Sequence, residues 1–380
     1  MQPVSEEKRI WFIDIARFYA ISLVFYGHFI ERIMMLQNPA AAVSYKFIYS
    51  FHLVLFIILA GYISRESDVE FGFTKYLKHR FFSRLLPFLV FTAIFMVLPV
   101  FFAGDFFHLQ LPSVEGYAGG LISTAFGLTL FCVPSWFILL IFSVEMVHYC
   151  AFRFLKSSNL RILAGILFFY VAGYWMNLQF DIVNPAKQKI IGWNYLFIHE
   201  AVVMYAFYLS GIYLRRKRFL MDTVPKKILI PGVIATFFIV LFTFHLNNGP
   251  FNFNYFSSVV IMFSAHGSFL WFPVTALAGS LFVLLLAKIT PHQKTILLMG
   301  QNTLMLMCLN GIFYHYINFR VAKWVVDHLS DSFLTITGIG FLMTLTSLAL
   351  CIPLIYLFNR FVPQLVGKPK TSGPWLKNFI

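Results

Sequence analysis

Long apolar segments recur along almost the whole chain. About ten of them are roughly 20 residues long, the length that an α-helix needs to cross the hydrocarbon core of a bilayer. Because 59% of the residues are hydrophobic and only 12% are charged, the chain holds more apolar surface than its own core could bury. We therefore expect an all-α integral membrane protein that forms one transmembrane domain over residues 1–380. The expected spans are 10–32, 46–64, 85–103, 135–154, 161–177, 195–214, 228–246, 268–288, 297–319 and 333–358.

The basic residues are spread unevenly over the loops between these segments. With a cytoplasmic N-terminus, 22 of the 29 Lys and Arg residues fall in inner loops or terminal segments, and six fall in outer loops. Positively charged loops normally stay in the cytoplasm. We therefore expect both termini in the cytoplasm, a basic cytoplasmic tail at about 359–380, and a multi-pass protein of the inner (cytoplasmic) membrane. The net charge of +14 then reflects topology and contacts with membrane lipids, and we expect no nucleic-acid partner.

Two further apolar stretches, 119–131 and 257–265, are too short to cross the membrane alone. They lie within less regular regions, 104–134 and 247–268, where the boundaries of neighbouring spans stay open. A single crossing by either stretch would move every later basic loop to the opposite side. We expect re-entrant or interfacial segments here, which are tolerated where protein or a water-filled cavity surrounds the backbone.

The first expected span carries four ionisable side chains, Asp14, Arg17, His28 and Glu31. Since a helix turns about 100° per residue, all four fit within an arc of about 100°. Ionisable groups at membrane depth are costly and normally face the bundle interior or a cavity. The stripe therefore indicates a functional face, with Arg17 in the cytoplasmic half and His28 about 16 Å farther toward the outer side.

Three members of the stripe, Asp14, Arg17 and His28, also have a purely structural interpretation. Asp14 and Arg17 are three residues apart and can form an ion pair that only neutralises a buried arginine. His28 can be a hydrogen-bonded packing residue, although a histidine also suits proton transfer near neutral pH. The shared stripe favours the proton-transfer role for His28. The four cysteines are scattered through apolar segments, and we expect no metal site.

Five motifs follow one another in the order seen in one known family. The segment IDIARFYAISLVFYGH places ten residues between Arg17 and His28. The other blocks are FIYSFHLVLFIILAGY at 47–62, the basic segment 78–87, PSWFILLIFSVE at 134–145 and GQNTLMLMCLNGIF at 300–313. Together they resemble the acyltransferase-3 family of integral membrane O-acyltransferases, in its stand-alone form without a fused SGNH domain. The resemblance covers most of the chain.

This resemblance implies transfer of an acyl group, commonly acetyl, from cytoplasmic acyl-CoA to a glycan or lipid-linked sugar across the membrane. The donor is a substrate, so no permanently bound cofactor is expected. Its phosphates need cations on the inner side, and Arg80 and Arg84 lie four residues apart on one helix face, with Lys78 and Arg65 nearby. His28 would act as general base on the acceptor hydroxyl or form an acyl-histidine intermediate.

Supporting roles are expected for a second set of polar residues. Arg17, together with Asp14, would orient a partner or stabilise developing negative charge. Candidates for substrate contacts or support are Glu31, His52, Glu145 and Asn310. Glu145 lies near mid-membrane, where pairing with a buried arginine is an equally good interpretation.

The chain also departs from the family pattern. Val54 and Ala60 replace the usual Pro and Ser of the second block, and the late block has Asn310 where a His is usual, with His315 about a turn farther on. The competing hypotheses are a transporter or flippase for a small anion or lipid-linked sugar, and a membrane protein without catalysis. Acceptor, acyl group and oligomeric state stay open.

Overall fold

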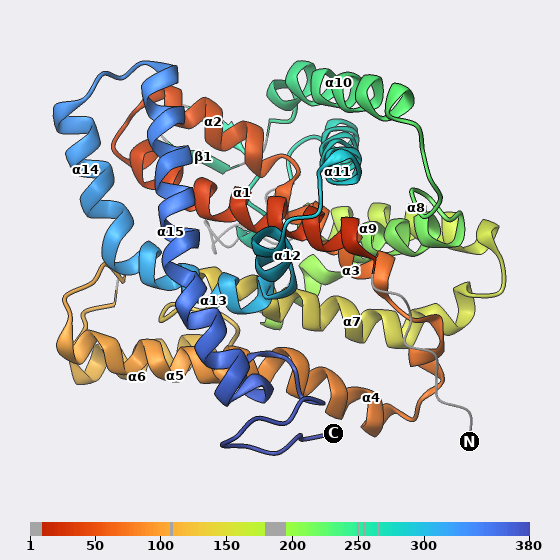
Figure 1. The fold of residues 1–380 in the computed structure, drawn as a ribbon, viewed down its shortest axis with the longest axis horizontal. Helices are drawn as coiled ribbons and strands as arrows, with labels where there is room; N and C mark the ends of the chain where they lie inside the picture. The colour runs from red at the N-terminus through yellow and green to blue at the C-terminus, as the bar shows by residue number, and fades with distance from the viewer. Residues whose placement is uncertain (1–9, 107–108, 179–194, 249–250, 254–255, 264–265) are drawn as a thin grey trace.

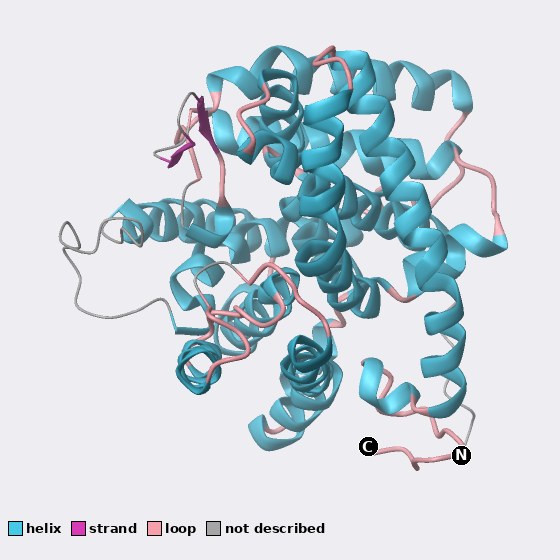
Figure 2. Cartoon of the chain, turned by 90° about the vertical axis from the view of Figure 1, so that its left-hand side faces the viewer, coloured by secondary structure: helices cyan, strands magenta, loops and turns pink. Residues whose placement is uncertain are grey.

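The computed structural model describes residues 10–106, 109–178, 195–248, 251–253, 256–263 and 266–380, and these are almost entirely helical (Figure 1). A short antiparallel hairpin, β1 (Phe251–Phe253) with β2 (Phe256–Ser258), lies at the edge of the helices (Figure 2). The α-helices are α1 Trp11–Met35, α2 Pro39–Tyr49, α3 His52–Ile63, α4 Phe73–Arg80, α5 Leu86–Phe101, α6 Val114–Ala125, α7 Trp136–Leu155, α8 Asn159–Leu178, α9 Ile198–Arg216, α10 Lys226–Thr243, α11 Trp271–Ile289, α12 Lys294–Gln301, α13 Thr303–Ile312, α14 Asn318–His328 and α15 Phe333–Phe361. Two π-helical turns, η2 Phe81–Leu85 and η8 Phe313–Ile317, join neighbouring α-helices.

The candidate membrane spans are close in number to the prediction. Within the described residues, nine helical segments are long and apolar enough to cross a bilayer, and the strongly bent segment between Lys294 and His328 is a tenth if its two parts count as one span. The prediction of a multi-pass, all-α membrane protein is therefore confirmed. Neither short apolar stretch forms a span: α6 has 12 residues, and the described part of 257–265 holds the end of β2 and a single helical turn.

The second and third spans begin earlier in the chain than expected. The second begins at Pro39, because Asn38 caps α2 by accepting a hydrogen bond from the backbone N–H of Ala41 at 2.9 Å. The third begins at Phe73, so the basic segment that we expected ahead of it is itself helical. The π turn η2 precedes Pro87, which cannot donate the usual backbone hydrogen bond.

The ninth span is broken rather than continuous. α12 and α13 meet at 82°, with Asn302 between them. The side-chain amide of Asn302 donates to the carbonyl of Leu298 at 2.7 Å and competes with the main-chain ladder. Next to the break, α12 runs so close to α1 that a Cβ at Gly300 would lie 1.8 Å from the carbonyl oxygen of Asp14.

Loop contacts divide the molecule into two ends. At one end Lys156 pairs with Glu70, and Arg216 pairs with Glu66. These are loops for which the charge distribution predicts the cytoplasmic side, and we call this the inner end. Contacts at the opposite, outer end are Asn38 with Asp331, Lys46 with Asn248 and Arg32 with Asp105. The grouping agrees with the predicted up-and-down order of the spans.

The tail after α15 is folded against the inner end. Gln364 is fully buried, and the ammonium of Lys368 donates to the side-chain oxygens of Asn302 and Asn359 at 2.8 and 2.6 Å. The tail therefore fixes the break between α12 and α13 from outside the membrane-spanning region. In the middle of the bundle, α1 packs against α2, α3, α11, α12, α13, α14 and α15.

Candidate active site

His28 lies in the outer half of α1 and is held by a residue far away in the sequence. Its Nδ1 is 2.5 Å from Oδ1 of Asn310 on α13, and only 8% of the histidine is exposed. With an amide oxygen as partner, Nδ1 carries the proton and Nε2 keeps its lone pair. The ring also meets Tyr314 edge-on at 5.0 Å between centroids. This arrangement gives His28 the tautomer that a general base requires.

Asn310 also presents a second polar group. Its Nδ2 is buried and has no hydrogen-bond partner among the described residues. A buried N–H donor without a partner is costly, because it has lost its water without replacement. The amide is therefore available to a substrate oxygen that arrives beside His28.

A carboxylate lies one turn farther along α1. The two carboxylate oxygens of Glu31 accept hydrogen bonds from the hydroxyls of Tyr314 and Tyr49, at 3.0 and 3.1 Å. The ring of His52 packs edge-on against Tyr49 at 4.7 Å, and its Nδ1 donates to the carbonyl of Ile48 at 2.9 Å. Glu31 and His52 thus both contact Tyr49, and His52 contributes through packing.

His315, the other residue considered for the missing family histidine, has a different role. Its Nδ1 donates to the carbonyl of Asp105 at 2.7 Å, and its Nε2 accepts from the backbone N–H of Val133 at 3.3 Å. Both ring nitrogens therefore hold backbone segments in place. His28, Asn310, Tyr314 and Glu31 form a group of contacts that we call the His28 cluster. Asp105 in turn pairs with Arg32 at 2.8 Å, which fixes the loop beside this cluster.

The inner half of α1 carries the ion pair that its spacing predicted. Arg17 and Asp14 are 3.6 Å apart, and Asp14 is buried where α12 crosses α1. The side chain of Arg17 is 24% exposed. Asp14 therefore anchors the guanidinium from the protein side, and Arg17 faces open space.

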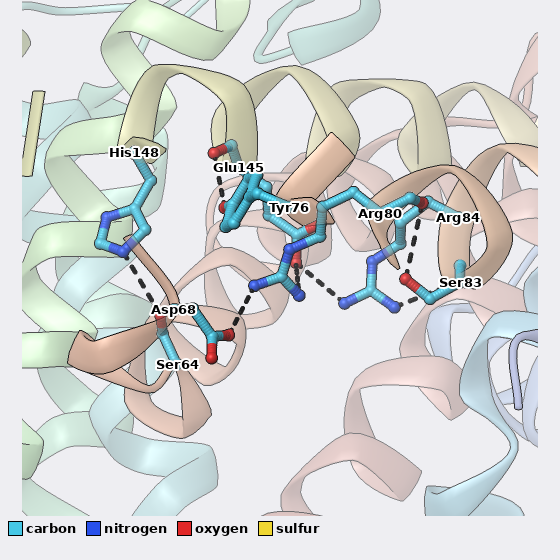
Figure 3. A network of polar contacts seen from close by, with 8 residues as sticks. All are labelled: Ser64, Asp68, Tyr76, Arg80, Ser83, Arg84, Glu145 and His148. Atoms are coloured by element: carbon cyan, nitrogen blue, oxygen red, sulfur yellow. Dashed lines mark hydrogen bonds and ion pairs between the residues drawn. The ribbon is translucent and has the colours of Figure 1, made fainter. Parts of the chain in front are cut away.

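Arg80 and Arg84 converge on a single buried carboxylate, Glu145 of α7 (Figure 3). One carboxylate oxygen, Oε1, lies 3.3 Å from Arg80 and 2.9 Å from Arg84. Arg80 also binds Asp68 at 3.0 Å, in the turn Glu66–Glu70. Tyr76 ties α4 to α7 by donating to the carbonyl of Glu145 at 2.8 Å. The interpretation of Glu145 as the partner of a buried arginine agrees with these contacts.

The two arginines differ in what they face. Arg80 is only 8% exposed and is held between two carboxylates. The side chain of Arg84 is 23% exposed and lines a cavity. Arg84 is thus placed to meet a ligand, and Arg80 is placed to hold the network together. Lys78 and Arg65 are exposed at the inner end.

The cavity brings Arg84 and Arg17 together. Its volume is about 90 Å³, and its other walls are side chains of α3, α7 and α13, apolar except for Thr303. Met307 of α13 also lines it, one helical turn from Asn310. His28 is not among the lining residues, so the cavity ends about one turn short of the histidine and its partner.

One buried polar cluster was missed by the sequence analysis. Glu200 of α9 is fully buried and makes a short contact with Nε2 of His266, which is 3% exposed, and Asn177 of α8 donates to the same carboxylate at 3.4 Å. An acidic residue inside an otherwise apolar helix was the available signal, but its partner lies in an irregular loop without a motif.

The fold and these residues define a class of protein: a multi-pass membrane protein in which one central helix carries an inner arginine facing a cavity and an outer, oriented histidine. Residues 10–356 match the family Acyl_transf_3, described as an acyltransferase domain. The chain belongs to this family and is a membrane acyltransferase, which confirms the resemblance seen in its motifs. No curated protein and no solved structure matches the chain.

Proposed function

We propose that this acyltransferase moves an acyl group, with acetyl as the proposed group, from cytoplasmic acyl-CoA to a hydroxyl of an extracytoplasmic or lipid-linked glycan. The observation that carries the proposal is the placement of two groups on α1. Arg17 faces the inner cavity, and His28 is oriented by Asn310 in the outer half. One rigid helix therefore links a donor site on the inner side to an acceptor site on the outer side.

The donor site is proposed for the cavity between Arg17 and Arg84. An acyl-CoA has a polyanionic phosphate end and a thin, nearly neutral arm. Arginine binds phosphate oxygens through paired N–H donors, and the apolar walls suit the arm. Arg80 supports Arg84 through their shared carboxylate, Glu145. Lys78 and Arg65 add positive charge at the entrance on the inner side.

The transfer step is proposed for the outer half of α1, at the paired side chains of His28 and Asn310. Nε2 of His28 takes the proton of the acceptor hydroxyl, and the hydroxyl oxygen attacks the thioester carbonyl. The new C–O bond forms, the C–S bond breaks, and the proton passes from His28 to the departing thiolate of CoA. The unpartnered amide N–H of Asn310 donates to the carbonyl oxygen as negative charge develops there.

The test uses inside-out membrane vesicles that contain the protein and its glycan acceptor. Radiolabelled acetyl-CoA is added on the cytoplasmic side. We expect label on the glycan and an equal amount of free CoA outside the vesicles. Movement of a solute without consumption of the thioester would instead support a transporter and would overturn the proposal.

A further inference from the structure

A second cavity opens at the outer end, between α5 and the η8–α14 segment. Its volume is about 440 Å³, and most of its wall is apolar: Leu98, Phe101, Phe102, Ala103 and Ile312. Phe101 is 72% exposed and Phe102 is 60% exposed. Both lie at the end of a membrane span, so this apolar wall faces the lipid of the outer leaflet.

Two polar groups complete the wall, Arg320 and Tyr316. Arg320 donates one N–H to the carbonyl of Ala103 at 3.1 Å. Its other N–H donors have no partner among the described residues. The hydroxyl of Tyr316 is buried without a hydrogen-bond partner among the described residues. An apolar trough with a guanidinium and a hydroxyl at headgroup depth is complementary to an amphiphile with an anionic head.

The cavity is joined to the His28 cluster by a short series of contacts. The ring of Tyr316 packs so closely on Gly104 that a Cβ there would lie 2.7 Å from the ring. The next residue, Asp105, pairs with Arg32, whose guanidinium lies over the ring of Tyr314 at 4.3 Å. Tyr314 in turn meets His28. A ligand seated in the cavity therefore has its polar end on the side of the molecule where the acceptor hydroxyl must arrive.

We propose that this cavity binds the lipid-phosphate end of a lipid-linked glycan acceptor. The phosphate contacts Arg320 and the Tyr316 hydroxyl, and the hydrocarbon chain lies along Phe101 and Phe102. The glycan then extends over the Gly104–Asp105 segment toward His28. This inference rests on the proposed function, because it assigns the acceptor of the same reaction.

The chain offers a matched control at the inner end. A groove between α7 and α8 has a volume of about 340 Å³, is lined by apolar side chains such as Phe154 and Phe168, and also carries one arginine, Arg161. None of its lining residues belongs to the His28 cluster. Replacing Arg161 removes a cation from a lipid-facing groove without touching the proposed acceptor site.

The experiment measures binding of a long-chain polyprenyl phosphate to the full chain in detergent, by native mass spectrometry. Polyprenol, phosphatidylglycerol and inorganic phosphate serve as competitors. We expect Arg320→Gln to weaken binding about tenfold, because it removes a charged hydrogen-bond donor, and Tyr316→Phe to weaken it by a smaller factor. Arg161→Gln should bind like the unmodified protein, and none of the three competitors should displace polyprenyl phosphate strongly.

Three results would overturn the assignment: no binding, binding unchanged in Arg320→Gln, or equal competition by phosphatidylglycerol, which would mark a site for bulk lipid. The proposed function is followed separately through release of CoA from acetyl-CoA. If polyprenyl phosphate binds through Arg320 but no CoA is released, the proposed function fails and the lipid-phosphate site stands. If CoA is released but polyprenyl phosphate does not bind, only the acceptor site fails.

Discussion

At the residue scale, the pairing of His28 with Asn310 is the contact that gives the polar stripe of α1 a chemical role. The stripe itself was predictable, because its spacing follows from one helix. Its partner was not, since Asn310 lies 282 residues away and no local pattern connects the two. The same holds for Arg80 and Arg84, whose common face was predicted but whose separate roles depend on Glu145, Asp68 and the cavity.

The role of Asn310 predicts the behaviour of its alanine variant. Asn310→Ala removes the acceptor that fixes the tautomer of His28 and the amide proposed for the carbonyl oxygen. We expect kcat to fall about tenfold or more, with the KM for acyl-CoA nearly unchanged, because the loss concerns the transfer step. Steady-state kinetics measure both constants, and an unaltered kcat would contradict the assignment.

We expect substitutions of Arg80 and Arg84 to change different quantities: the stability of the protein for Arg80 and the binding of acyl-CoA for Arg84. Arg84→Gln should raise the KM for acyl-CoA about fivefold or more, because it removes a phosphate-binding group from the cavity wall. Arg80→Gln removes the charged contacts of Arg80 with Asp68 and Glu145, while Glu145 keeps Arg84, and we expect it to lower the stability by about 2 kcal/mol. Thermal unfolding and kinetics of the two matched variants test this expectation, which fails if both variants change the same quantity.

At the element scale, irregular helices lie at both polar clusters. The π turn η2 carries Arg84, and the π turn η8 carries Tyr314 and His315. Such turns are frequent at functional sites, because one extra residue redirects the side chains around it. The sequence did not predict either turn, since FFSRL and FYHYI contain no Gly or Pro that would mark an irregular helix. The bend at Asn302 was missed because it depends on the side chain of Asn302 and on contacts with the tail.

The close crossing of α12 over α1 predicts a sharp dependence on Gly300. Gly300→Ala would place a methyl group 1.8 Å from the carbonyl oxygen of Asp14, so α12 would have to move. We expect a loss of stability of about 1–3 kcal/mol and a lower rate of acyl transfer, because Asp14 anchors Arg17.

Gly338→Ala is the control for this prediction. It makes the same change in α15, where a Cβ would meet nothing within 4 Å. Thermal unfolding of the two variants side by side measures the difference. Equal unfolding temperatures would show that the crossing tolerates a side chain.

At the scale of the whole molecule, the order of the spans was largely predictable. Apolar length gave their number, and the distribution of basic residues gave the grouping of loops that the inner and outer ends display. What the sequence could not provide is which helices are neighbours. The central place of α1, in contact with seven other helices, depends on long-range packing that no segment encodes alone.

The predicted orientation can be tested by labelling single cysteines. Cys150 is the exposed native cysteine, so it is first replaced by serine. In intact cells stripped of their outer layers, a membrane-impermeant maleimide should label Lys323→Cys at the outer end and spare Lys377→Cys in the tail. Inside-out vesicles should give the reverse pattern. Labelling of Lys377→Cys from outside would contradict the cytoplasmic location of the tail.

The most direct test of the account is the rate of acyl transfer in inside-out vesicles after His28→Ala. A general base contributes a factor of about 100 to 10,000, so we predict a loss of at least about 100-fold, with unchanged thermal unfolding. His328→Ala, which removes an exposed histidine at the outer end, should leave the rate as it was. A folded His28→Ala protein that transfers acyl groups at the original rate would contradict the central claim.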